Sequence, residues 1–155
     1  MRIGIGYDLH KLVSGRPFIM GGVKIESDKG PEGHSDGDAL CHAIADALLG
    51  AACLGDIGLW FPPDDPKFEG ADSIELLKKV AAAVKTKGYA ISNIDSIVIC
   101  EKPKISPHYE AMRARLADAM ELSVDQVSVK ATTNEKLGEI GAGLAVAAQA
   151  IVLLN

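Results

Sequence analysis

The chain has 155 residues, of which 48% are hydrophobic and 24% are charged, and its net charge is -5. This length suffices for one domain with its own core, so we expect residues 1–155 to form a single domain. The acidic balance argues against a nucleic-acid-binding protein, because such a surface needs clustered cations. A small phosphorylated substrate remains compatible with it, since a metal ion and a few lysines can supply positive charge locally.

The cysteines and the apolar segments indicate the compartment. Cys41, Cys53 and Cys100 form no CxxC pair, and we interpret them as reduced, buried thiols. Met1 leads directly into a strand-like segment without the features of a signal peptide, and no apolar segment is long enough to span a membrane. We therefore expect a cytoplasmic protein with no membrane partner, from a bacterium or, without its transit peptide, from a plastid.

The first third of the chain predicts strands and a loop. Residues 2–8 alternate apolar side chains with Gly4 and Gly6, which is typical of a strand that another backbone or a ligand approaches closely. Residues 16–25 contain two short apolar runs around a Gly-Gly pair, which predicts a hairpin or a bulged strand. Residues 26–33 are rich in Gly, Pro, Asp and Lys, and they predict a loop.

A helix is predicted next. The apolar residues that share one helical face are Leu40, Ile44, Ala47, Leu48 and Ala51. Either Ser35 or Asp36 would cap the start of this helix. Residues 55–66 then predict a long irregular connection, and such loops are often functional or mobile.

The second half of the chain alternates helices and strands. Asp72 followed by Glu75 has the spacing of a capping box, which predicts a helix over 73–87. Pro107 suits the first turn of a further helix that ends near residue 121. The remaining predicted strands cover residues 91–100, 126–132 and 145–154. This order favours an α/β (α+β) fold, a two-layer sandwich with a mixed sheet on one side and helices on the other.

Asp8, His10 and His42 are the candidate metal ligands. Residues at i and i+2 of a strand point to the same face, so Asp8 and His10 can bind one ion together. One carboxylate and two imidazoles suit zinc, with a fourth position open for substrate. Asp38 and Asp46 lie one helical turn on either side of His42, and either could accept a hydrogen bond from its second ring nitrogen.

Further polar clusters have a functional and a simpler interpretation. His34 and Ser35, at a loop-to-helix junction, suit an anion or an ordinary helix cap. The segment 130–136 combines hydroxyls, a carboxylate and lysines, which suits a polyphosphate or merely an exposed strand end. The rigid segment 102–104 suits the edge of a base or a simple connection. Asp56, with Gly58, suits vicinal hydroxyls or an ordinary turn.

Several of these motifs, in this order, resemble the 2-C-methyl-D-erythritol 2,4-cyclodiphosphate synthase family of the non-mevalonate isoprenoid pathway. The resemblance covers nearly the whole chain. Its most specific segments are residues 6–10 (GYDLH), 34–38 (HSDGD) with His42 and Asp46, 54–58 (LGDIG), Pro103-Lys104, and 130–136 (KATTNEK).

The resemblance implies a homotrimer of ferredoxin-like subunits with active sites shared between neighbours. It implies zinc at Asp8, His10 and His42, and magnesium or manganese that bridges the substrate diphosphate and is held partly by Glu135. The implied substrate is a cytidine diphosphate ester of methylerythritol 2-phosphate, which cyclises with release of CMP. His34 and Thr133 would be the catalytic residues. The implied substrate-binding residues are Ser35, Asp56, Gly58, Phe61, Asp65, Cys100, Pro103, Lys104, Ile105, Ser106, Thr132, Thr133 and Glu135.

The chain departs from the family pattern at two places. Residues 61–65 read FPPDD where the family often has FPDTD, which changes the contacts to the erythritol part through Pro63 and Asp64. Glu139 and Ala142 replace an aromatic residue and an arginine that many members carry. Without that arginine we predict weak or no binding of isoprenoid diphosphates at the trimer centre.

Two other function classes fit the same residues. A metal-dependent phosphoester hydrolase would use a metal-bound water and release ring-open products. A binding module, such as a metal or nucleotide sensor, would bind cytidine nucleotides without turnover. Analysis of the reaction products distinguishes all three.

Overall fold

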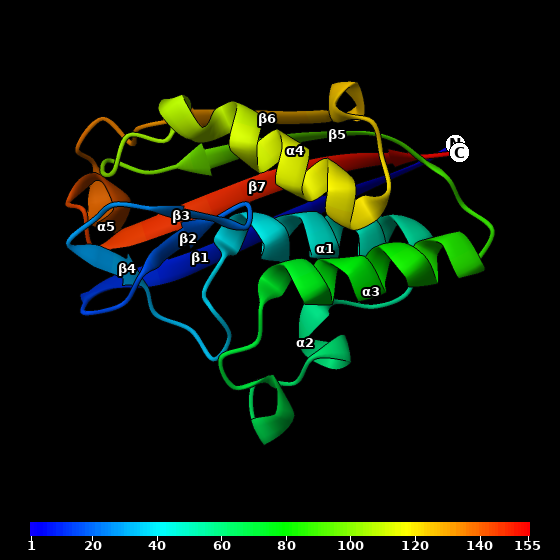
Figure 1. Cartoon of the computed structure of the whole chain (residues 1–155), viewed down its shortest axis with the longest axis horizontal. Helices are drawn as coiled ribbons and strands as arrows, with labels where there is room; N and C mark the ends of the chain where they lie inside the picture. Colours follow the sequence, from blue (N-terminus) through cyan, green and yellow to red (C-terminus); the bar gives the residue numbers. More distant parts are fainter.

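The computed structural model describes residues 1–155 and contains a five-stranded sheet, three long helices and a small hairpin (Figure 1). The strands are β1 (Arg2–Ser14), β2 (Phe18–Met20), β3 (Val23–Ile25), β4 (Lys29–Pro31), β5 (Ile91–Ile99), β6 (Val127–Thr132) and β7 (Ala145–Leu154). The helices are α1 (Ala39–Ala52), α2 (Ile57–Trp60), α3 (Ser73–Thr86), α4 (Tyr109–Met120) and α5 (Gly138–Gly141). Short 3-10 turns are η1 (Pro66–Phe68), η2 (Ser106–His108) and η3 (Val124–Gln126).

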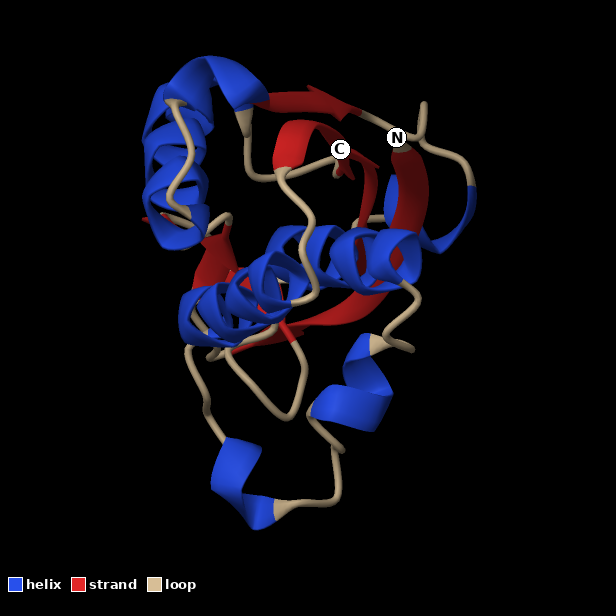
Figure 2. Cartoon of the chain, turned by 90° about the vertical axis from the view of Figure 1, so that its right-hand side faces the viewer, coloured by secondary structure: helices blue, strands red, loops and turns tan.

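The sheet is mixed and has the strand order β4-β1-β7-β5-β6. Only β5 and β6 are parallel, while β1 pairs antiparallel with β7 along ten residues and β7 pairs antiparallel with β5. The sheet curls, and the long helices α1, α3 and α4 lie on its inner side, with α1 packed directly against β1 and β7 (Figure 2). The predicted mixed α+β architecture is therefore confirmed.

Gly4 and Gly6 allow α1 to lie directly against β1. A Cβ atom at Gly6 would fall on the carbonyl oxygen of Ala43 and only 2.8 Å from the amide nitrogen of Ala47. A Cβ at Gly4 would lie 2.7 Å from the amide nitrogen of Ala51. The close approach predicted for these glycines is thus the approach of a helix backbone, and this helix carries His42.

Side chains on the two faces of β1 differ in their surroundings. Gly4 and Gly6 are buried beneath α1, in a molecule with a single core cluster of 37 buried residues. On the opposite face, Ile3, Ile5 and Tyr7 are 72%, 63% and 57% exposed. The outer face of β1 therefore carries a row of large apolar side chains.

Some predicted boundaries are wrong, and local hydrogen bonding explains why. Asp38, not Ser35 or Asp36, caps α1, because its carboxylate accepts from the amides of Leu40 and Cys41. Within the predicted loop 26–33, β4 pairs with the end of β1.

The long connection and the later helices also differ from expectation. The segment 55–66 contains α2, and a 3-10 turn begins at its end, so it is less irregular than predicted. Asp72 caps α3 as predicted, but Glu75 pairs with Lys78 and completes no capping box. The helix predicted from Pro107 begins as a 3-10 turn and becomes α-helical at Tyr109. The predicted strands 126–132 and 145–154 correspond to β6 and β7.

No helix in the structure combines the length and the apolar character needed to cross a membrane.

Candidate active site

Asp8, His10 and His42 meet at one point, as the sequence predicted. Nε2 of His10 lies 2.8 Å from Oδ2 of Asp8, and Nδ1 of His42 lies 2.9 Å from the same oxygen. The two ring nitrogens are 3.2 Å apart. The strand β1 supplies the first two side chains and α1 the third, so the contact between these elements brings the ligands together.

The second nitrogen of each histidine is also fixed. Nδ1 of His10 donates to the carbonyl oxygen of Glu32 at 2.6 Å, which leaves Nε2 with its lone pair toward Asp8. Nε2 of His42 lies 2.9 Å from the hydroxyl of Ser73 and 3.2 Å from that of Ser35. His10 therefore presents a lone pair to the shared point, and His42 does the same when a serine hydroxyl accepts from its Nε2.

The predicted carboxylate partners of His42 do not hydrogen-bond to it. Asp38 is buried and accepts from backbone amides, including those of Gly21 and Gly22. Asp46 accepts from the amide of Ile57 at 2.7 Å, and so holds the start of α2. The hydroxyl of Ser73, on α3, takes the place predicted for these carboxylates.

The electrostatics of the triad favour a positive charge. Burial raises the pKa of the Asp8 carboxyl, but the hydrogen bonds and charges of His10 and His42 outweigh it and hold this pKa well below its usual range. Burial lowers the pKa of His10, but the adjacent Asp8 outweighs it and the pKa is raised. A carboxylate and two imidazole nitrogens this close together favour a positive charge at the shared point, which either a ring proton or a metal ion can supply.

The donor set fits a divalent metal ion. Bonds of about 2.0–2.1 Å in a tetrahedron separate the ligand atoms by about 3.3–3.4 Å. The observed separations of 2.8, 2.9 and 3.2 Å are shorter by about half an ångström or less. Asp8, His10 and His42 are therefore a metal-binding triad.

A cavity of about 200 Å³ opens beside the triad. His10, His42, His34, Ser35 and Phe61 are among its lining residues, together with Gly58 and Pro63. Nε2 of His34 donates to the carbonyl oxygen of Asp65 at 3.1 Å. The predicted catalytic His34 thus faces the same cavity as the metal ligands.

Three further predicted substrate-binding residues, Asp56, Gly58 and Asp65, lie on the segment that borders this cavity. Asp56 caps α2 by accepting from the amide of Leu59, and Gly58 lies within that helix. Asp65 pairs with Lys67 at 2.6 Å, and hydrogen bonds from Lys67 lower the pKa of this exposed carboxyl.

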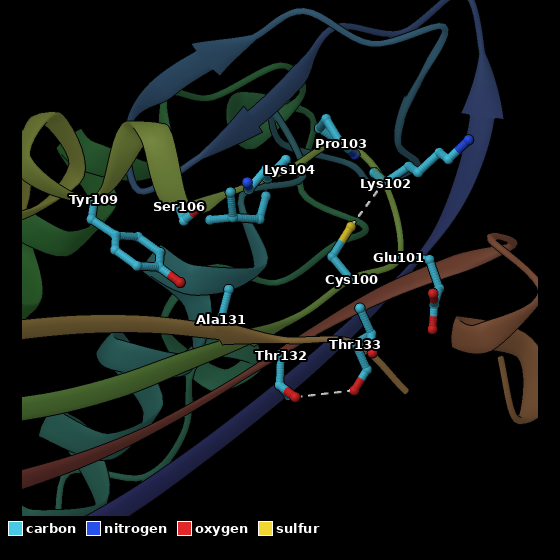
Figure 3. A pocket seen from close by; sticks show the side chains of 11 residues that line it. Cys100, Glu101, Lys102, Pro103, Lys104, Ser106, Tyr109, Ala131, Thr132 and Thr133 are labelled. Carbon is cyan, nitrogen blue, oxygen red and sulfur yellow. Dashed lines mark hydrogen bonds between the residues drawn. The ribbon is translucent and has the colours of Figure 1, made fainter. Parts of the chain in front are cut away.

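A second cavity, of about 610 Å³, lies at the carboxyl ends of β5 and β6 (Figure 3). Its lining includes seven of the predicted substrate-binding residues, namely Cys100, Pro103, Lys104, Ile105, Ser106, Thr132 and Thr133, the last of which is also predicted to be catalytic. The thiol of Cys100 donates to the carbonyl oxygen of Lys102 at 2.9 Å, which shapes the loop at one end of the cavity.

The polar loop after β6 is held by an acidic residue that sequence reasoning missed. One carboxylate oxygen of Glu101 accepts from the amides of Asn134 and Lys136 at 3.0 and 3.1 Å. Within this loop the hydroxyl of Thr133 donates to the carboxylate of Glu135 at 3.1 Å. Nothing in the local sequence indicates this role for Glu101, because its partners are more than thirty residues away.

The two cavities are separate in one chain. They share no lining residue, and strands β7 and β5 lie between β1 and β6. The register places Leu9, Ala147, Ile99 and Thr132 side by side across the sheet. Three spacings of about 4.8 Å give roughly 14 Å between β1 and β6 along the sheet. Thr133 and Glu135 therefore lie apart from the metal-binding triad of their own chain.

The matches to known proteins extend over the whole chain. The YgbB family model matches residues 1–155. A 2-C-methyl-D-erythritol 2,4-cyclodiphosphate synthase from Synechococcus sp. (strain JA-2-3B'a(2-13)) is 60% identical over 154 residues, which cover 99% of this chain and 98% of the relative. The enzyme of the same name from Trichlorobacter lovleyi is 54% identical, with the same coverage.

Solved structures agree. A 2C-methyl-D-erythritol-2,4-cyclodiphosphate synthase in a CDP-bound form is 40% identical, with a TM-score of 0.91, and the alignment covers 99% of this chain and all of that one. The bifunctional IspDF from Campylobacter jejuni is 42% identical, with a TM-score of 0.95, and this chain spans only 42% of that longer chain. The chain belongs to the YgbB family, among the 2-C-methyl-D-erythritol 2,4-cyclodiphosphate synthases.

Proposed function

We propose that this chain converts 4-diphosphocytidyl-2-C-methyl-D-erythritol 2-phosphate to 2-C-methyl-D-erythritol 2,4-cyclodiphosphate and CMP, within the non-mevalonate isoprenoid pathway. The observation that carries the proposal is the convergence of Asp8, His10 and His42 beside a cavity, in a chain 60% identical to a synthase of that name. We propose zinc as the ion, because two imidazoles and one carboxylate with an open fourth position suit it.

The reaction needs positioning more than acid or base catalysis. An oxygen of the 2-phosphate attacks the β-phosphorus, a new P–O bond forms, and the bond to the CMP oxygen breaks with its electron pair leaving on CMP. The nucleophile is already anionic at neutral pH, so no side chain must remove a proton. An ion held by the triad would supply positive charge to the phosphate oxygens.

The chain's own residues orient the two ends of the substrate. We propose that His34 donates to a phosphate oxygen beside the triad, with Ser35, Asp56, Gly58, Phe61 and Asp65 around the sugar parts. We propose that the larger cavity takes the cytosine, with backbone groups between Cys100 and Ser106 at the base edge. A structural relative of 40% identity in a CDP-bound form supports a cytidine nucleotide as a ligand of this fold. Thr133 and Glu135 would then contact the diphosphate, Glu135 through magnesium or manganese.

We further propose that the chain, acting as one domain, assembles into a homotrimer of ferredoxin-like subunits with shared active sites. Two observations support this assembly. Ile3, Ile5 and Tyr7 form an exposed apolar row, and contact with another protein surface would remove these side chains from water. The cavity beside the triad and the larger cavity lie on opposite sides of two strands in one chain. A neighbouring copy would bring the missing half to each cavity.

Product analysis tests the activity. Purified protein with zinc and magnesium should form the cyclic diphosphate and CMP in equal amounts, as measured by mass spectrometry. Ring-open hydrolysis products would support a hydrolase instead, and tight cytidine nucleotide binding without turnover would support a sensor. Asp8→Ala and His42→Ala should lose zinc and activity while circular dichroism stays unchanged. Full zinc in both variants would refute the ligand assignment.

Co-expression of two inactive variants tests the shared site. His42→Ala disables the metal half, and Glu135→Gln disables the other half. If neighbouring copies share each site, mixed trimers contain some sites with two intact halves, and activity should return. Light scattering should give the mass of three chains. A mixed assembly with no activity, or a monomer with full activity, would contradict the proposal.

A further inference from the structure

Ser73 lies between His42 of the metal-binding triad and the carboxylate of Asp36. The proposed reaction uses neither Ser73 nor Asp36. The side chain of Ser73 is buried, being 1% exposed, at the first residue of α3. Its hydroxyl oxygen lies 2.9 Å from Nε2 of His42 and 2.5 Å from Oδ1 of Asp36. The hydroxyl of Ser35 is farther away, at 3.5 Å.

The direction of each hydrogen bond follows from the atoms present. A serine hydroxyl has one proton, and an ionised carboxylate can only accept. Ser73 therefore donates to Asp36, and its oxygen lone pair accepts from the N–H of His42. This arrangement requires the proton of a neutral His42 to reside on Nε2, so that Nδ1 directs its lone pair toward Asp8.

Asp36 is held firmly at the far end of this chain of hydrogen bonds. Its Oδ2 accepts from the amide of Ser73 at 3.1 Å, and its Oδ1 accepts from the amide of Asp38 at 3.2 Å. Its own amide donates to the carbonyl oxygen of Ala71 at 3.1 Å. The carboxylate thus joins the start of α3 to the loop before α1, and its place does not depend on His42.

The two histidines are supported in different ways. His10 donates to a backbone carbonyl, that of Glu32, which no side-chain substitution removes. His42 donates to Ser73, whose hydroxyl in turn depends on Asp36. A carboxylate that accepts through a hydroxyl makes the imidazole a stronger electron donor, since chains of hydrogen bonds polarise one another.

We propose that Ser73 and Asp36 are positioning residues of the metal centre, which fix the tautomer of His42 and strengthen Nδ1 as a metal ligand. The inference deepens the proposed function, on whose metal site it rests. Neither residue belongs to the metal-binding triad or lines the cavity beside it. Their effect reaches the site only through His42, and it should appear in metal affinity before it appears in catalysis.

Zinc affinity, measured by competition with a chromophoric chelator at fixed pH, tests the proposal. Ser73→Ala and Asp36→Asn should each weaken zinc binding about 10–100-fold. The double variant should lose no more zinc affinity than the weaker-binding single variant. Both substitutions break the same chain of hydrogen bonds from Asp36 through Ser73 to His42, which we call the relay. Additive losses would indicate two independent structural effects and would overturn the relay.

Asp72→Ala is the matched control. Asp72 caps the same helix one residue earlier, accepting from the amide of Ile74 at 2.8 Å, and it does not contact His42. This variant should melt at a lower temperature but bind zinc like the wild type. Equal zinc loss in Asp72→Ala and Ser73→Ala would show that the helix start, not the hydroxyl, matters.

Cobalt replacement gives a second readout that does not depend on turnover. The visible d–d bands of the Co²⁺ form should shift in Ser73→Ala and Asp36→Asn and stay unchanged in Asp72→Ala. Wild-type zinc affinity and unchanged bands in both relay variants would overturn the inference, even with the proposed activity intact. Conversely, a relay effect on zinc in a protein that forms no cyclic product would refute the proposed function alone.

Discussion

Replacing Gly6 with alanine should separate the two elements that carry the metal ligands. The added Cβ would fall on the carbonyl oxygen of Ala43 and lie 2.8 Å from the amide nitrogen of Ala47, both in the backbone of α1. Non-bonded heavy atoms normally keep about 3.5–4.0 Å apart. Backbone atoms in a helix cannot rotate away as side chains do, so α1 must retreat from β1 as a body, by on the order of 1 Å.

That displacement exceeds what the metal site tolerates. His42 lies on α1, one residue before Ala43, and its Nδ1 is 2.9 Å from Asp8 on β1. Metal–ligand distances vary by only about 0.2 Å. We therefore expect Gly6→Ala to lose most of its zinc affinity, and to lower the free energy of unfolding by roughly 3 kcal/mol, the upper end of ordinary overpacking.

Gly50→Ala is the matched control on the same helix. A Cβ at Gly50 would meet nothing within 4 Å, so alanine should stabilise α1 by about 0.5–1 kcal/mol and leave zinc binding unchanged. Urea unfolding and chelator competition measure the two quantities. Wild-type zinc affinity in a folded Gly6→Ala variant would refute the argument that this backbone contact sets the metal geometry.

The remaining predictions concern stability, thiol chemistry and ligand choice. Asp38→Ala should lower the free energy of unfolding by at least about 3 kcal/mol, because three buried amides and one partly buried amide lose their acceptor; an unchanged urea midpoint would contradict this. Burial raises the pKa of the Cys100 thiol to about 11, so alkylation at pH 8.5 should be much slower in the folded than in the unfolded protein. The folded state keeps this thiol protonated up to a higher pH than the unfolded state does. The free energy of unfolding should therefore fall as the pH rises from about 9 to 11, and thermal melts across that interval check the sign. Geranyl diphosphate should bind weakly or not at all, since Ala142 offers no cation, and tight saturable binding in calorimetry would count against that view.

The metal-binding triad was predicted, and short-range geometry accounts for part of it. Asp8 and His10 share one face of a strand by the two-residue period, whatever the strand packs against. Gly4 and Gly6 of β1 predicted that another backbone or a ligand approaches this strand closely. The amphipathic segment that carries His42 was the only predicted helix near β1 in the chain. Local periodicity therefore pairs Asp8 with His10, whereas His42 joins them only through the packing of α1 against β1.

The support around the triad was not predictable from local patterns. Ser73 reaches His42 only because α3 packs beside α1, and a serine after Asp72 in the sequence looks like part of an ordinary helix start. Asp38 was expected near His42, yet the Gly21-Gly22 turn folds over the helix start and takes up its carboxylate. In both cases a tertiary contact selects among partners that the sequence makes equally available.

The two halves of the site also differ in how firmly they are held, which bears on their roles. The triad lies on β1 and α1, whose backbones are in direct contact, so its geometry is set by the most buried part of the fold. Glu135 and Lys136 instead lie on an exposed loop with φ values of 51° and 63°. In this left-handed region the backbone of a residue other than glycine is strained. Glu101 stabilises this loop through two amides. An ion that stays bound between turnovers needs fixed ligands, whereas a diphosphate and the ion that accompanies it must enter and leave, so the rigid half suits zinc and the tethered loop suits the substrate with its magnesium or manganese.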